Sequence, residues 1–204
     1  MVLTSIPGRQ ATQTLIHMDI LTLLRRKEEP RSPQKFSGEG TVLISFVSKL
    51  DQVATSNSPE RLVKLLKKHL AIQSKIIENH SGFVLSFEGD SILAFWPKAE
   101  IQQNCALQAF EAAHEMLSKV DNAVDYQIVL GTGLVAGDFF GQTKQYQVVG
   151  EGMDIADQLS RIRFPAHLVI LLTDSTKARL VNSSASFQTI GQLKNGSDIL
   201  AFID

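Results

Sequence analysis

The segment from Phe83 to Trp96 constrains the fold of this chain more than any other segment. It contains two short runs of mainly apolar residues, FVLSF and SILAFW, which are joined by Glu88, Gly89 and Asp90. Such runs are typical of buried strands, and a Gly-Asp pair between them favours a tight turn. The sequence therefore predicts a β-hairpin with the Asp90 carboxylate at its tip, where the carboxylate could hold a cation.

Helices and strands are predicted on both sides of this hairpin. An apolar strand covers residues 41–47, and Ser58 followed by Pro59 is typical of a helix start, with serine as the N-cap. This helix is expected to end near residue 81. A second helix over 99–119 and a strand over 126–135 follow the hairpin. The order β-α-β-β-α-β predicts an α/β (α+β) fold with a ferredoxin-like core.

The remaining segments are predicted as additions to this core. Strands are expected at 145–149 and 167–172, a short helix at 154–162, and a closing hairpin over 187–203. Residues 1–40 form a predicted appendage, in which a helix over 12–27 precedes a linker rich in Pro, Gly and Ser. This helix is expected to pack either on its own domain or on a partner. The predicted division is therefore 1–40 and 41–204.

Composition and charge exclude several classes of protein. With 44% hydrophobic and 20% charged residues, the chain can bury an ordinary core. A formal net charge of −1 gives no bulk attraction to nucleic acid or to an anionic membrane. No apolar run is long enough for a membrane span, and the order of a signal peptide is missing. The single cysteine, Cys105, excludes an internal disulfide, indicates a cytoplasmic location, and is expected to be buried.

Four segments, taken in order, resemble the class III nucleotidyl cyclase homology domain, the family of adenylate and guanylate cyclases. They cover residues 41–51, 79–90, 131–141 and 146–159. The resemblance implies the class III cyclase fold with a C-terminal extension. It also implies a reaction in which the ribose 3′-oxygen of a nucleoside triphosphate attacks the α-phosphorus. In this family two metal ions assist that attack, and two domains build each site across a dimer interface.

Most positions that the family uses for catalysis are changed in this chain. The resemblance places the two metal-binding aspartates at Phe46, which cannot bind a metal, and at Asp90, which can. Asp90 alone would bind a divalent metal weakly, because such sites generally need several oxygen ligands. The remaining positions are Ser86 and Gln147 for the base-reading lysine and its partner, Asp154 for the ribose-orienting asparagine, and Gln158 for the transition-state arginine.

These changes favour a degenerate cyclase domain that is inactive alone and acts as a dimerising structural or regulatory partner. The partner is expected to be a second cyclase homology domain or a larger assembly. One alternative is an adenylate cyclase subunit, which converts ATP to cyclic AMP and pyrophosphate only with a complementary domain. Another is a sensor that binds a nucleotide or bicarbonate without turnover. No cofactor is assigned, although Mg²⁺ or Mn²⁺ is expected if activity remains. Within the family, the chain most resembles the first cyclase domain of soluble adenylyl cyclase, which also has aspartate at the position of Asp154.

Several residues allow a structural interpretation beside the functional one. Asp90 is expected either to cap its own turn or to contact a metal or nucleotide, and Glu88 is expected to be solvated. The glycines over 131–141 look like a phosphate cradle, but close strand packing explains them better, because no P-loop Lys-Ser/Thr follows. Arg161 and Arg163 are expected at a solvated helix end, from which one could reach an anion. Surface or helix-end positions without metal spacing are expected for His69, His80 and His114.

Overall fold

A computed structural model describes residues 33–47, 55, 57–98, 104–119, 125–142, 145–181 and 183–203. The helix predicted over 12–27 lies outside these residues, as does the start of the helix predicted at 99. The elements in chain order are β1 (Phe36–Val47), α3 (Pro59–Asn79), β2 (Phe83–Glu88), β3 (Ser91–Pro97), α4 (Cys105–Ser118), β4 (Tyr126–Phe140), β5 (Gln145–Gly150), α5 (Glu151–Ser160), β6 (Leu168–Thr173), α6 (Asp174–Lys177), β7 (Gln188–Gln192) and β8 (Asp198–Ile203).

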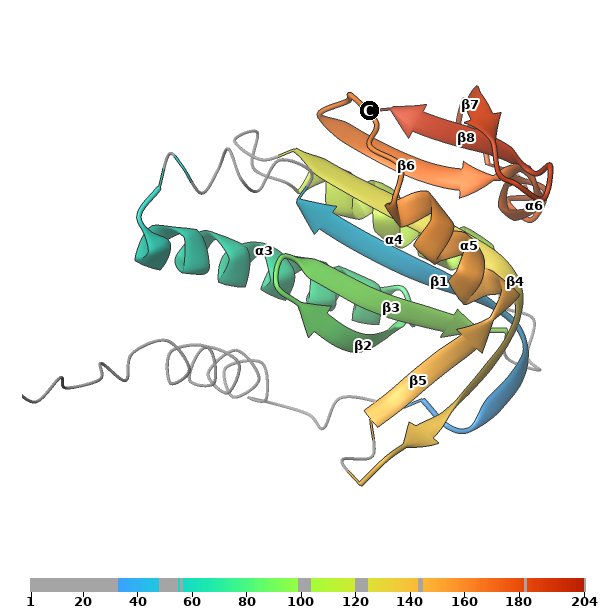
Figure 1. The fold of residues 1–204 in the computed structure, drawn as a ribbon, viewed down its shortest axis with the longest axis horizontal. Helices are drawn as coiled ribbons and strands as arrows, with labels where there is room; N and C mark the ends of the chain where they lie inside the picture. Colours follow the sequence, from blue (N-terminus) through green and yellow to red (C-terminus); the bar gives the residue numbers. More distant parts are fainter. Residues whose placement is uncertain are drawn as a thin grey trace, which may run out of the picture. The chain divides into compact units, whose positions relative to one another are not determined.

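The strands form one sheet (Figure 1). Its order is β2-β3-β1-β4-β6-β8-β7, and β5 pairs with the far end of β4. The β4–β6 pair is parallel, whereas the other pairs are antiparallel. The order β2-β3-β1-β4 is that of a ferredoxin-like core, so the predicted α+β fold is confirmed. The strands from β6 to β8 form the C-terminal extension.

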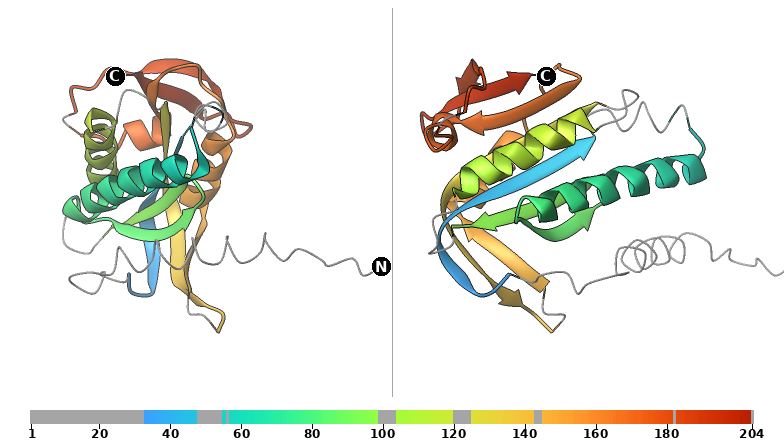
Figure 2. Two further views of the ribbon diagram at one scale, coloured as in Figure 1. Left: turned by 90° about the vertical axis from the view of Figure 1, so that its left-hand side faces the viewer. Right: turned by 180° about the vertical axis from the view of Figure 1, so that it is seen from behind.

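Different helices cover the two faces of the sheet (Figure 2). Helices α3 and α4 pack on one face, where Ile77 and Ala109 join a core that includes Leu43 and Ile128. Helix α5 packs on the other face, where Leu159 joins a core that includes Val42 and Val129. Because β1 and β4 are covered on both faces near their centres, the central residues of both strands form almost continuous apolar runs in the sequence.

The boundaries of several elements differ from the predicted ones for identifiable reasons. Strand β1 begins at Phe36, not at residue 41, because residues 36–40 pair with residues 133–137 of β4. The residues predicted as the end of a linker are therefore part of the sheet. Helix α4 begins at Cys105, because the Asn104 side chain accepts the Leu107 backbone N–H at 3.1 Å and caps the helix there. Ser58 caps α3 as predicted.

Strand β5 continues into α5 without a loop, so α5 begins at Glu151, three residues before the predicted start. The junction residue, Gly150, has a φ of +116°, a conformation that glycine adopts most readily. Helix α5 then lies against Gly131 of β4. A Cβ atom on Gly131 would overlap the Gly152 carbonyl oxygen and would lie 2.6 Å from the Ala156 backbone nitrogen. This contact supports the prediction that close packing explains the glycine-rich strand.

Candidate functional site

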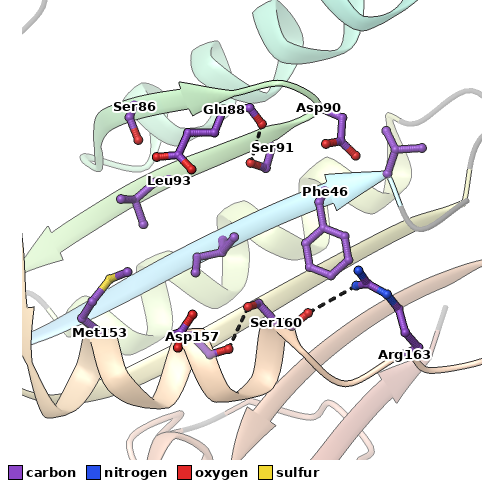
Figure 3. A pocket seen from close by; sticks show the side chains of 12 residues that line it. Phe46, Ser86, Glu88, Asp90, Ser91, Leu93, Met153, Asp157, Ser160 and Arg163 are labelled. Atoms are coloured by element: carbon purple, nitrogen blue, oxygen red, sulfur yellow. Dashed lines mark hydrogen bonds between the residues drawn. The ribbon is translucent and has the colours of Figure 1, made fainter. Parts of the chain in front are cut away.

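A groove lies between α5 and the β2–β3 hairpin, above one face of β1 (Figure 3). We refer to it as the hairpin groove; its volume is about 380 Å³. Ligand pockets of small molecules are typically of this size or larger. Its lining comprises Ile44, Phe46 and Val47 from β1, Ser86, Glu88, Asp90, Ser91 and Leu93 from the hairpin, Met153, Asp157 and Ser160 from α5, and Arg163.

The floor of the hairpin groove is apolar because of the alternation along β1. Residues 44 and 46 point to the same face of the sheet, and Leu93 of β3 lies beside them. Phe46 is 9% exposed, so its ring is almost fully packed among its neighbours. The first position at which the family would have a metal-binding aspartate is therefore part of an apolar floor.

The hairpin wall of the groove carries two carboxylates, Glu88 and Asp90. Gly89 makes the turn possible with a φ of +63°, and the Ser91 hydroxyl donates to the Glu88 carbonyl oxygen at 2.8 Å. Glu88 is exposed at the rim, as predicted, whereas Asp90 is half-buried. Burial raises the pKa of Asp90, while the backbone N–H groups of Asp90 and Val47 and the charge of Arg163 oppose that rise. Asp90 thus combines a contact within its own turn with a place in the groove.

Helix α5 supplies the opposite wall through residues that the sequence analysis did not single out. Met153, Asp157 and Ser160 are spaced by four and three residues, so they share one face of the helix. This spacing was visible in the sequence, but only the packing of α5 on β4 shows which face meets the groove. The Arg161 guanidinium pairs with Asp157 at 2.9 Å and lies in solvent. Arg163 instead lies over the Phe46 ring, 5.1 Å from its centroid.

The structure divides the six family positions into two groups. Phe46, Ser86 and Asp90 meet in the hairpin groove. The other three are exposed and do not line it: Gln147 on β5, and Asp154 and Gln158 on α5. The Gln158 side-chain nitrogen donates to the Asp154 carbonyl oxygen at 3.3 Å, a contact within the helix.

The lining of the hairpin groove does not fit the pair of metal ions that the family uses. Phe46 offers no ligand atom where an aspartate would be required. Among the described residues, no group of three or more His, Cys, Asp or Glu side chains could hold a metal ion. Of the two positions that the resemblance assigns to metal ligands, Asp90 carries a carboxylate and Phe46 does not.

The remaining candidate residues have structural environments. Cys105 is buried as predicted, and burial raises the pKa of its thiol. His80 caps the end of α3 and contacts Glu115 at 2.8 Å, while His114 is exposed. The prediction was wrong for His69, which is 3% exposed and lies 5.6 Å from the ring of Tyr126. Its side of α3 faces the sheet, because the apolar stripe of this helix is wider than the leucine pattern suggested.

Comparisons with known proteins agree with this architecture. No model of a known protein family matches the chain. Adenylate cyclase 1 of Rhizobium meliloti is 22% identical over 169 residues, which are 76% of this chain and 25% of that protein. The chain thus spans about a quarter of the length of the curated relatives that it matches.

Solved structures of cyclase domains have the same fold. The adenylyl cyclase CyaB from P. aeruginosa has a TM-score of 0.71 at 19% identity, covering 84% of this chain and 97% of that one. A dimeric guanylyl cyclase domain from the fungus Blastocladiella emersonii has a TM-score of 0.70 at 15% identity, covering 84% and 98%. The chain therefore has the class III nucleotidyl cyclase fold, as these adenylyl and guanylyl cyclase domains do. None of its described helices is long and apolar enough to cross a membrane.

Proposed function

We propose that this chain is a degenerate class III cyclase homology domain, inactive alone, that acts as a dimerising structural or regulatory partner. The observation that carries this proposal is the Phe46 ring in the floor of the hairpin groove. A two-metal mechanism needs oxygen ligands on both sides of the reacting phosphate. An almost buried aromatic ring at that position removes one ligand, and no side-chain oxygen of β1 lines the groove in its place.

The dimerising part of the proposal rests on an apolar surface of the β4–β5 pair. Ala136 pairs with Val149 and Phe140 pairs with Gln145, so these residues share one face with Leu134, and the polar pair Asp138–Gln147 lies between them. Leu134 is 69% exposed, Val149 54% and Phe140 48%. Exposed apolar patches of this kind are typical of protein interfaces. The dimeric guanylyl cyclase domain among the similar structures supports a second cyclase homology domain as the partner.

Two measurements test this proposal. The first incubates the chain with ATP or GTP and Mn²⁺, with and without candidate cyclase domains, and assays cyclic nucleotide. We expect no product from the chain alone, and turnover by the isolated chain would refute the proposal. The second measures association by sedimentation. Val149→Asp is expected to weaken association at least about tenfold, because it places a charge in an apolar interface. Val181→Asp is the matched control, because Val181 is 60% exposed outside this surface.

One observation favours a second candidate function, an adenylate cyclase subunit that is active only with a complementary domain. Asp90 remains half-buried in the hairpin groove and forms no ion pair with a described residue. A domain that supplied the other ligands could use it to hold Mg²⁺ or Mn²⁺. Turnover in the mixed assay that disappears with Asp90→Ala would establish this alternative over the first.

A nucleotide sensor without turnover is a third candidate, supported by the size of the hairpin groove. It predicts a rise in melting temperature with ATP, GTP or bicarbonate, since a ligand that binds only the folded state stabilises it. A flat response to all three would exclude it. For each candidate we propose a cytoplasmic location, in keeping with the single buried Cys105.

A further inference from the structure

The hairpin groove contains a cation of its own. The guanidinium carbon of Arg163 lies 5.1 Å from the centroid of the Phe46 ring, within the range of a cation–π contact. One of its nitrogens donates to the Ser160 carbonyl oxygen at 3.3 Å, so the exposed side chain lies at the end of α5. In the view of Figure 3, the Phe46 ring lies between this guanidinium and the Asp90 carboxylate.

The groove lining carries charges of both signs, namely Glu88, Asp90, Asp157 and Arg163. Asp157 is paired with Arg161 at 2.9 Å, and both side chains of this pair are exposed. Arg163 is the one cation among the lining residues. The positive charge of Arg163 lowers the pKa of Asp90, against the effect of burial, so the two groups interact through space.

We propose that Arg163 takes the place of a divalent metal ion as the resident cation of the hairpin groove. Phe46 and Arg163 act as a pair: the ring removes a metal ligand, and the guanidinium that it supports supplies positive charge to the same region. Metal binding is disfavoured for two reasons, the missing carboxylate at position 46 and repulsion by the Arg163 guanidinium. The groove therefore has two features that oppose metal binding, and the lost ligand is only one of them. This inference rests on the proposed function, because it concerns a groove that has lost its catalytic metal site. Its test is independent of that function, because it measures metal binding and not turnover or association.

The pairing has a consequence that the loss of a ligand alone would not have. If Phe46 were merely a lost ligand, restoring an aspartate would restore metal binding. With Arg163 in place, an aspartate at position 46 would instead form an ion pair with the guanidinium, since arginine and carboxylate form strong charge-assisted hydrogen bonds. Restoring the metal site therefore requires both Phe46→Asp and removal of Arg163.

The test measures Mn²⁺ binding to the full chain by electron paramagnetic resonance of the free ion. Four proteins are compared: wild type, Phe46→Asp, Phe46→Asp with Arg163→Ala, and Phe46→Asp with Arg61→Ala. The last is a matched control, because Arg61 is an exposed arginine of α3 that does not line the groove. We expect the Arg163→Ala double variant to bind Mn²⁺ at least about tenfold more tightly than Phe46→Asp alone, because a like charge nearby disfavours a bound cation. The Arg61→Ala control should match Phe46→Asp.

Equal affinity of Phe46→Asp and its Arg163→Ala double variant would overturn the proposal. So would an equal gain from Arg61→Ala, which would show a general effect of net charge. Adding Asp90→Asn to the double variant should abolish the gain, and persistence of binding would place the metal elsewhere. If Phe46→Asp unfolds the chain, the same series is made with Phe46→Asn, which adds a neutral oxygen ligand. Failure here would leave the turnover and association tests unaffected, because neither of them measures metal binding.

Discussion

The close contact between α5 and β4 makes Gly131→Ala the most informative single substitution for the groove wall. The added Cβ would overlap the Gly152 carbonyl oxygen and approach the Ala156 nitrogen to 2.6 Å. Both are backbone atoms, so no side-chain rotation relieves the overlap, and α5 must move away from the sheet.

The magnitude follows from the kind of atoms involved. Overpacking a close-packed core costs about 1–3 kcal/mol, and an overlap with backbone should lie at the upper end, about 3 kcal/mol. With a urea slope of about 2 kcal/mol per molar, the unfolding midpoint should fall by roughly 1.5 M. The melting temperature should fall by about 6–12 °C.

Urea unfolding followed by circular dichroism measures this change, and Gly191→Ala is the matched control. Gly191 lies in β7, where the nearest atom to an added Cβ is the Ile199 Cδ1 at 3.8 Å, an ordinary contact. The control should stay within about 1 kcal/mol of wild type. If Gly131→Ala unfolded at the same urea concentration as Gly191→Ala, the argument that this glycine sets the distance of α5 would be refuted.

Three further predictions concern buried and charged groups. Ser45→Ala should destabilise the fold by about 1–3 kcal/mol, because the Ser45 hydroxyl donates to the side-chain carbonyl oxygen of the buried Gln73 at 2.5 Å. Adding Gln73→Leu should recover most of this lost stability, which a double-mutant cycle measures. The hydrogen bond from Arg179, and after it the one from Lys98, lowers the pKa of Glu39 below its usual 4.5. The stabilisation that the Glu39 carboxylate gives to the fold is therefore complete above pH 4.5, and it disappears as the pH falls through the lower pKa of the folded state. Glu39→Gln should therefore lower stability at pH 7 and lose less stability than wild type on acidification, and parallel curves in acid denaturation would contradict this. Because burial raises the pKa of Asp90, its charged form costs stability, so Asp90→Asn should be at least as stable as wild type at pH 7 in urea; a clear loss would show that the carboxylate is structural.

The sequence alone predicted the elements whose local signals agree with their tertiary environment. Ser58 and Pro59 mark the start of α3, and Gly89 marks the hairpin turn, because capping and positive φ depend on a few adjacent residues. The start of β1 was missed, since Phe36 to Gly40 are held by pairing with β4, and pairing over such a sequence distance leaves no local pattern.

The candidate site could be predicted only in part for the same reason. Phe46, Ser86 and Asp90 were found through the resemblance, and the structure brings them together. The α5 wall was not predicted, because its spacing fits any amphipathic helix until the packing partner is known. Arg163 is exposed, as the sequence predicted. Its place over Phe46 depends on the path of the chain after α5, which no motif specifies.

The direct passage from β5 into α5 has a mechanical consequence. Val149 lies on the exposed apolar surface, and Met153, four residues later, already lines the hairpin groove. Only residues 150–152 separate the two, and β5 passes into α5 without a loop. A partner that binds the strand at Val149 would therefore act on the same continuous segment that lines the groove, which couples association to the shape of the groove.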